Sequence, residues 1–180
     1  MKIAFLGWGS LIWDESREFK IDDGWKKDGP KLPIEFARIS RDGRLTLVLY
    51  SDAQLIEVLW AEANTEDLDE ARCNLQEREK ANYKDIHYVS LDDNNTNSKV
   101  APEILDGIIR WARTKKLDAV VWTGLDSKFK NEFNEDSAVE YLKGLENGAK
   151  QKAKEYIQKA PCQIRTKVRE RVEQELGWKQ

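Results

Sequence analysis

The chain has 180 residues, of which 35% are charged and 40% are hydrophobic, and its formal net charge is −3. A chain of this length can bury roughly two thirds of its unfolded surface in one core, and the composition is typical of a globular protein rather than a disordered one. A slightly acidic charge gives no general attraction to nucleic acid or to an anionic membrane surface, so we expect neither partner. We predict a single domain over residues 1–180.

Targeting and metal-binding signals are not apparent in the sequence. The N-terminal apolar run is too short to span a membrane and lacks the layout of a signal peptide, and no later segment reaches about 18 uninterrupted apolar residues. The two cysteines lie far apart, and His87 is the only histidine. We therefore expect a cytoplasmic protein without a metal site or a histidine-based catalytic triad.

The hydrophobic pattern predicts strands mainly in the first half of the chain and helices mainly in the second. The predicted strands are 2–6, a short edge strand at 18–21, 34–40, 44–50 after the turn at 41–43, 55–63, 84–91 and 118–123. The predicted helices are 65–80, 102–115, 137–159 and a last helix after Pro161. Because strands and helices mix irregularly, the predicted fold class is α+β.

The first predicted strand ends in two closely spaced glycines, Gly7 and Gly9. Glycine allows backbone angles that other residues avoid and leaves no Cβ in the way, so successive amides can turn toward one anionic ligand. The alternative is an ordinary tight turn after the strand. A dinucleotide-binding fingerprint is not expected, because Ile12 stands where that pattern needs a third small residue.

The predicted helix over residues 65–80 places one carboxylate on its apolar side. At about 100° per residue, Glu79 falls in the same sector of roughly 80° as the apolar residues of this helix. Those residues are Leu68, Ala71 and Leu75. Burial raises the pKa of a carboxyl group and lets it accept a proton near neutral pH. The alternative is that Glu79 lies beyond the edge of the core, in water or beside a basic neighbour.

Two segments of the chain resemble the γ-glutamylcyclotransferases, above all the glutathione-specific branch. Residues 7–13, Gly-Trp-Gly-Ser-Leu-Ile-Trp, are similar to that family's Gly-Tyr-Gly-Ser-Leu-Ile-Trp, with Trp8 in place of the tyrosine. Residues 75–83, Leu-Gln-Glu-Arg-Glu-Lys-Ala-Asn-Tyr, are similar to its Leu-Asp-x-Arg-Glu-Lys-Gly-Gly-Tyr. The two segments also follow one another in the family's order and at a separation that the family shows.

The resemblance implies a mixed β-barrel with flanking helices, to which this chain adds C-terminal helices. It implies a cofactor-free enzyme in which the α-amine of a γ-glutamyl peptide or amine attacks the γ-carbonyl and releases 5-oxoproline and the amine. Glu79 would then be the catalytic acid/base, and no metal would be required. The substrate-binding residues implied are those of the glycine-rich turn: Gly7, Trp8, Gly9, Ser10 and Leu11.

Other hypotheses remain open at this point. A non-catalytic module of the same fold would bind a small carboxylate without turning it over, and the departures at Trp8, Ala81 and Asn82 leave room for it. A structural interaction protein would use the charged face of the last helix. Residues 100–180 have no counterpart in the resemblance, and one hypothesis is that their helices shape or cover the pocket.

Overall fold

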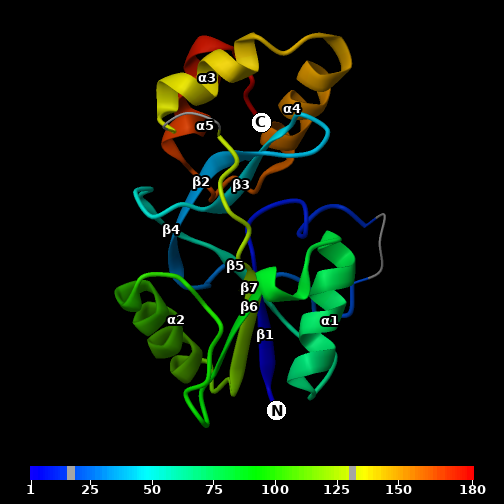
Figure 1. The fold of residues 1–180 in the computed structure, drawn as a ribbon, viewed down its shortest axis with the longest axis vertical. Helices are drawn as coiled ribbons and strands as arrows, with labels where there is room; N and C mark the ends of the chain where they lie inside the picture. Colours follow the sequence, from blue (N-terminus) through cyan, green and yellow to red (C-terminus); the bar gives the residue numbers. More distant parts are fainter. Residues whose placement is uncertain (16–18, 130–132) are drawn as a thin grey trace. The chain divides into compact units, whose positions relative to one another are not determined.

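A computed structural model of the chain describes residues 1–15, 19–129 and 133–180 (Figure 1). The described residues form seven strands, five α-helices and one short 3₁₀ helix, which confirms the α+β class. None of the helices in these residues is long and apolar enough to cross a membrane.

Contacts divide the chain into two compact units. The first unit consists of Met1–Gly7, Leu11–Leu32 and Glu57–Gly124. The second consists of Trp8–Ser10, Pro33–Ile56 and Leu125–Gln180. The chain passes between the units several times, and a single domain over residues 1–180 stays a prediction.

The first unit is built on a four-stranded sheet with the order β5-β1-β7-β6. Its strands are β1 (Ile3–Gly7), β5 (Leu59–Glu62), β6 (Ile86–Ser90) and β7 (Ala119–Thr123). β1 pairs antiparallel with β5 and parallel with β7, and β6 pairs antiparallel with β7. Every residue of β1 is buried, as expected for a central strand that is covered on both faces.

Two helices cover the faces of this sheet, α1 (Leu68–Glu79) on one side and α2 (Pro102–Thr114) on the other (Figure 1). α1 packs its buried Ala71 and Leu75 into a core cluster with Phe5 of β1. α2 buries Ile108 and Ala112. A short 3₁₀ helix, η1 (Tyr83–Asp85), connects α1 to β6. The apolar stripe predicted for the first helix is therefore the stripe that packs on the sheet.

The second unit contains most of a three-stranded sheet with the order β3-β2-β4. Its strands are β2 (Lys31–Ile39), β3 (Leu45–Leu49) and β4 (Leu55–Glu57). The predicted hairpin turn is confirmed, because β2 and β3 are antiparallel and Gly43 between them has a φ of 80°. Three helices complete this unit: α3 (Glu135–Lys143), α4 (Asn147–Lys159) and α5 (Lys167–Glu175).

The start of the first helix differs from the prediction. The helix begins at Leu68, because the carboxylate of Asp67 accepts a hydrogen bond from the Glu70 amide at 2.8 Å and caps the helix. The hydroxyl of Thr65 accepts a hydrogen bond from the Asp67 amide at 3.2 Å. Thr65 therefore stabilises the turn that leads into the helix.

Two predicted elements are each broken in two. The strand predicted over 55–63 divides into β4 and β5 around Val58, whose amide donates to Pro30, and the two pieces belong to different sheets. The helix predicted over 137–159 is interrupted after Lys143, where Gly144 closes α3. Asn147 then begins α4 with a φ of 39°, a conformation that a continuous helix does not allow.

The described strands form two sheets and no closed barrel, so the mixed β-barrel that the resemblance implies is not confirmed. The edge strand predicted at 18–21 is only partly testable, because Glu18 lies outside the described residues. Ile21 makes an isolated antiparallel bridge with Ala63 rather than part of a strand.

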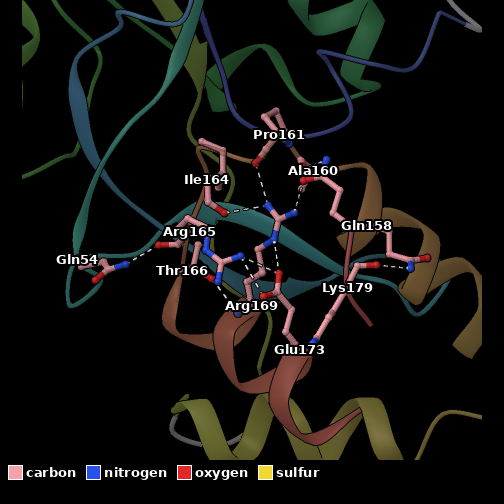
Figure 2. Close-up of polar contacts among 11 residues, drawn as sticks. Gln54, Gln158, Ala160, Pro161, Ile164, Arg165, Thr166, Arg169, Glu173 and Lys179 are labelled. Atoms are coloured by element: carbon pink, nitrogen blue, oxygen red, sulfur yellow. Dashed lines mark hydrogen bonds and ion pairs between the residues drawn. The ribbon is translucent and has the colours of Figure 1, made fainter. Parts of the chain in front are cut away.

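A buried arginine holds the C-terminal segment of the second unit together (Figure 2). The guanidinium of Arg169 is 1% exposed and donates to the carbonyls of Pro161 at 2.8 Å and Ile164 at 3.1 Å. It also donates to the side chain of Gln180 at 3.1 Å and lies 3.4 Å from the carboxylate of Glu173. These contacts fix the loop between α4 and α5 and the end of the chain.

Candidate functional site

β1 and α1 run in the same direction through the first unit. A hollow of about 520 Å³ is lined by Ile3, which begins β1, and by Thr65 and Glu66, which precede α1. Both elements therefore start at this hollow, and Figure 1 shows α1 extending beside β1. Their last residues, Gly7 and Glu79, consequently lie toward the opposite end of this layer.

Arg78 belongs to the second segment of the resemblance and contacts Asp14, the residue after the first segment. Its side chain is 3% exposed, and Nη2 donates to the carbonyl oxygen of Asp14 at 3.0 Å and lies 3.7 Å from Oδ2 of the same residue. Asp14 directly follows the first segment. On its other side, Nη1 of Arg78 lies 3.7 Å from Oε1 of Glu79. A buried guanidinium requires such partners, because an unpaired buried charge is costly. Neither the helix periodicity nor the resemblance assigns a role to Arg78.

Glu79 is the last residue of α1. Lys80, with a φ of 50°, ends the helix, and its amide donates to carbonyls of the preceding turn. The Glu79 side chain is 19% exposed, so it lies between the core and open solvent. The two alternatives for Glu79 therefore do not exclude one another: it is largely shielded and it has a basic neighbour in Arg78.

The structure corrects the reason for the two glycines of the turn. Gly7 and Gly9 do not have positive φ angles, unlike Gly24, Gly43 and Gly177. Gly7 is the last residue of β1 and has the extended conformation of a paired strand. An unusual backbone conformation therefore does not explain glycine at these positions.

Close approach of aromatic side chains explains both glycines. A Cβ atom at Gly7 would lie 2.5 Å from the ring of Trp25, and one at Gly9 would lie 2.6 Å from the hydroxyl oxygen of Tyr156. Both distances are too short for carbon, so any larger side chain would require its neighbour to move. The ring of Trp25 in turn stacks against Phe19.

The predicted site residues are divided between the two units. Gly7, Leu11 and Glu79 belong to the first unit, and Trp8–Ser10 belong to the second. Leu11 packs against the core cluster that includes Leu75 of α1. Trp8 is buried, and the two residues after it are half-buried. Binding of a substrate by residues 7–11 stays a prediction.

Sequence reasoning missed one buried carboxyl group, that of Glu35 in β2. It is 3% exposed, and it accepts hydrogen bonds from the amides of Phe36 at 2.8 Å and Val168 at 3.4 Å. Burial raises the pKa of Glu35, while a hydrogen bond from the hydroxyl of Thr166 and those from the two amides oppose the rise. The sequence did contain a signal for this burial. Glu35 lies between Ile34 and Phe36 in a predicted strand whose polar and apolar residues do not alternate.

Comparison of the chain with protein-family models, with curated proteins and with solved structures finds no match. Within residues 1–15, 19–129 and 133–180, no group of three or more His, Cys, Asp or Glu side chains is arranged to hold a metal ion. The features that bear on function are therefore the two segments of the resemblance and the contacts of Arg78 with Asp14 and Glu79.

Proposed function

We propose that this protein is a γ-glutamylcyclotransferase-like enzyme that cyclises a γ-glutamyl peptide or amine to 5-oxoproline and releases the amine. The observation that supports it best is the position of Arg78. This buried side chain binds Asp14, 64 residues away in sequence, and faces the carboxylate of Glu79. The guanidinium group of the second segment thus contacts the residue that directly follows the first, as expected if both segments contribute to one site.

The finer description of the fold belongs to the same proposal. The first unit has a mixed sheet, with a parallel pair, β1 and β7, between antiparallel neighbours. We propose that it is a variant of the family's mixed barrel and that α3, α4 and α5 are additions. The combination of parallel and antiparallel pairs in one sheet supports this part of the proposal.

Glu79 acts as the acid/base in the proposed reaction. The α-nitrogen of the substrate forms a bond to the γ-carbonyl carbon, and the bond from that carbon to the leaving nitrogen then breaks. Glu79 takes protons from the α-ammonium group and gives them to the leaving nitrogen, so bonds and protons balance without an oxidant or a reductant. Partial exposure of Glu79 supports this role, because a proton-transfer group must be reachable by the substrate.

The α-carboxylate of the substrate has to be held while its amine approaches the carbonyl. The resemblance gives this task to the backbone amides of residues 8–11 and to the hydroxyl of Ser10. In the proposed mechanism these groups bind and orient the substrate, and Glu79 moves the protons.

The proposal is tested by incubating the protein with glutathione and a panel of γ-glutamyl amino acids and amines, and measuring 5-oxoproline. Glu79→Gln is the inactive variant, and Glu77→Gln, on the exposed side of the same helix, is its matched control. Release by the wild type and by Glu77→Gln, but not by Glu79→Gln, supports the enzyme. Stabilisation by 5-oxoproline without release identifies the carboxylate-binding module instead. Neither release nor stabilisation overturns both.

A further inference from the structure

Asn147 is the only asparagine of the chain that directly precedes a glycine, and it lies where α4 begins. Both Asn147 and Gly148 are exposed. The carbonyl carbon of an asparagine side chain can be attacked by the backbone nitrogen of the next residue, because the product is a five-membered ring. Glycine hinders this attack least, since it has no Cβ beside the nitrogen and allows the widest range of backbone angles.

The amide of Gly148 has no acceptor in the helix. Gly148 is the second residue of α4, and the first amides of a helix lack intrahelical carbonyl partners. The carbonyl of Glu146 accepts from the amides of Ala149 at 3.2 Å and Lys150 at 3.4 Å, while the side chain of Glu146 makes no capping hydrogen bond. In the part of the chain that the structure describes, neither the Gly148 amide nor the Asn147 side chain is hydrogen-bonded.

The backbone of Asn147 departs from helical geometry. Its φ is 39°, whereas residues of a right-handed helix have negative φ angles. The regular helix geometry that keeps an interior amide nitrogen away from the preceding side chain therefore does not apply here. Gly148 itself does not have a positive φ, and a Cβ there would meet no atom within 4 Å. Neither conformation nor packing requires glycine at position 148.

Asn97 shows how the same chain protects an asparagine. It also precedes a small residue, Ser98, but both ends of its side-chain amide are held at the edge of β6. Its Oδ1 accepts from the amide of Tyr88 at 3.0 Å, and its Nδ2 donates to the carbonyl of Ile86 at 3.0 Å. These hydrogen bonds must break before the side chain can turn toward the next nitrogen. Asn97 is therefore an internal control for Asn147.

We propose that Asn147 is a modification site at which the folded protein deamidates without an enzyme. The nitrogen of Gly148 forms a bond to the side-chain carbonyl carbon of Asn147, the bond from that carbon to the side-chain nitrogen breaks, and ammonia leaves. Water then opens the resulting succinimide at either carbonyl. The products are aspartate, with the original backbone, and isoaspartate, with the backbone routed through the side chain.

The two products have opposite effects on the start of α4. The first turn of this helix contains no acidic residue, so an aspartate at 147 adds a negative charge that the helix dipole favours. Isoaspartate adds a methylene group to the main chain. The added atom displaces the amides of Ala149 and Lys150 from the carbonyl of Glu146, and the first turn opens.

The site is tested by incubating the folded protein at mildly alkaline pH and following the peptides that contain Asn147 and Asn97 by mass spectrometry. Asn147 should convert and Asn97 should not, whereas in urea both should convert. Gly148→Ala is the matched variant, and it should fold because its Cβ meets no atom. Its conversion at 147 should be slower by about tenfold or more, because the added Cβ keeps the nitrogen from the attacking geometry.

Two results would overturn the inference. Conversion of Asn147 in urea but not in the folded protein would show that the start of α4 protects it. Equal rates in the wild type and in Gly148→Ala would show that the nitrogen of residue 148 is not the attacking group. The folded wild type converting at Asn147, with Gly148→Ala spared, supports the inference.

Thermal unfolding tests the effect of the products on α4. Asn147→Asp supplies the aspartate form directly, and ion-exchange chromatography separates the isoaspartate form from aged wild type. The midpoint of Asn147→Asp should equal or exceed that of fresh wild type, and the midpoint of the isoaspartate form should be lower. An isoaspartate form with the midpoint of the wild type would overturn the predicted opening of the first turn.

Discussion

Glu35 and Glu79 are both largely shielded from water, and their surroundings are opposite in kind. Glu35 lies inside a strand and is held by the amides of Phe36 and Val168. Glu79 lies at the end of a helix, is more exposed, and faces the guanidinium of Arg78. Burial alone would select Glu35 as the proton-transfer group.

The hydrogen bonds of Glu35 argue against it as the proton-transfer group. The donors around Glu35 come from its own strand and from the first turn of α5, so its carboxylate serves as a cap for that helix. A group occupied in this way has little capacity left for a substrate. Glu79 is partly accessible and lies next to Arg78, which binds the chain after the glycine-rich turn. In its accessibility and its partners, Glu79 therefore fits the proposed proton-transfer role better than Glu35 does.

The largest expected effect is on turnover, which should depend on Glu79 and not on Glu35. Glu79→Gln cannot accept a proton at neutral pH, so 5-oxoproline release at saturating substrate should fall by about 10²-fold or more. Glu35→Gln should leave turnover of the folded protein unchanged. Affinity for 5-oxoproline, measured by calorimetry, should change much less than turnover in the Glu79 variant.

Loss of turnover in Glu35→Gln, with full turnover in Glu79→Gln, would reverse the assignment. Loss of stability in Glu79→Gln with persisting turnover would make Glu79 only an ion-pair partner of Arg78. Thermal unfolding of each variant, measured beside the kinetics, distinguishes these cases.

A smaller effect is expected at the arginine beside Glu79. Arg78→Met removes the contacts with Asp14 and Glu79 and should lower the free energy of unfolding by about 2 kcal/mol and turnover by about tenfold. Arg169→Met is the matched control, because Arg169 is equally buried but contacts carbonyls of the C-terminal segment. It should lose stability and keep its kcat.

Arg78→Lys adds a test of position against charge. A lysine keeps the positive charge but lacks the fork that contacts both neighbours. Partial recovery of turnover relative to Arg78→Met is expected. Equal kcat in the methionine, lysine and wild-type proteins would show that Arg78 has no part in positioning Glu79.

Local patterns in the sequence predicted the elements that pack on the first sheet. The spacing of Ala71 and Leu75 indicated the buried face of α1, and both residues are fully buried. The continuous apolar run of β1 indicated a central strand, and every residue in it is buried. These features depend on neighbours within a few residues, which periodicity detects.

Contacts between distant parts of the chain could not be predicted in this way. The amide that binds Glu35 belongs to Val168, 133 residues later, and the hydroxyl that requires glycine at position 9 comes from Tyr156. A glycine looks the same in the sequence whether it is needed for a positive φ angle or for the close approach of another side chain. Only the structure distinguishes the two for Gly9.

The smallest expected effect concerns stability against pH and again contrasts the two carboxyl groups. Burial raises the pKa of Glu35 above its ordinary value of 4.5. A carboxyl group with a raised pKa binds its proton more tightly in the folded state than in the unfolded state. Its contribution to stability is therefore fully present below the unfolded pKa and is lost as the pH rises through the folded pKa.

Glutamine does not ionise, so Glu35→Gln removes this dependence. Asp28 and Glu62 have lowered pKa values, through hydrogen bonds from Lys115 and Lys26 respectively, and they shift stability in the opposite sense. Asp28 and Glu62 are present in both the wild type and Glu35→Gln, so their contributions cancel in the difference between the two free energies of unfolding. Urea unfolding from about pH 4 to about pH 7 should show the wild type losing free energy of unfolding relative to Glu35→Gln as the pH rises. A constant difference, or one of opposite sign, would mean that the amides of Phe36 and Val168 outweigh burial and that Glu35 is an ionised cap throughout.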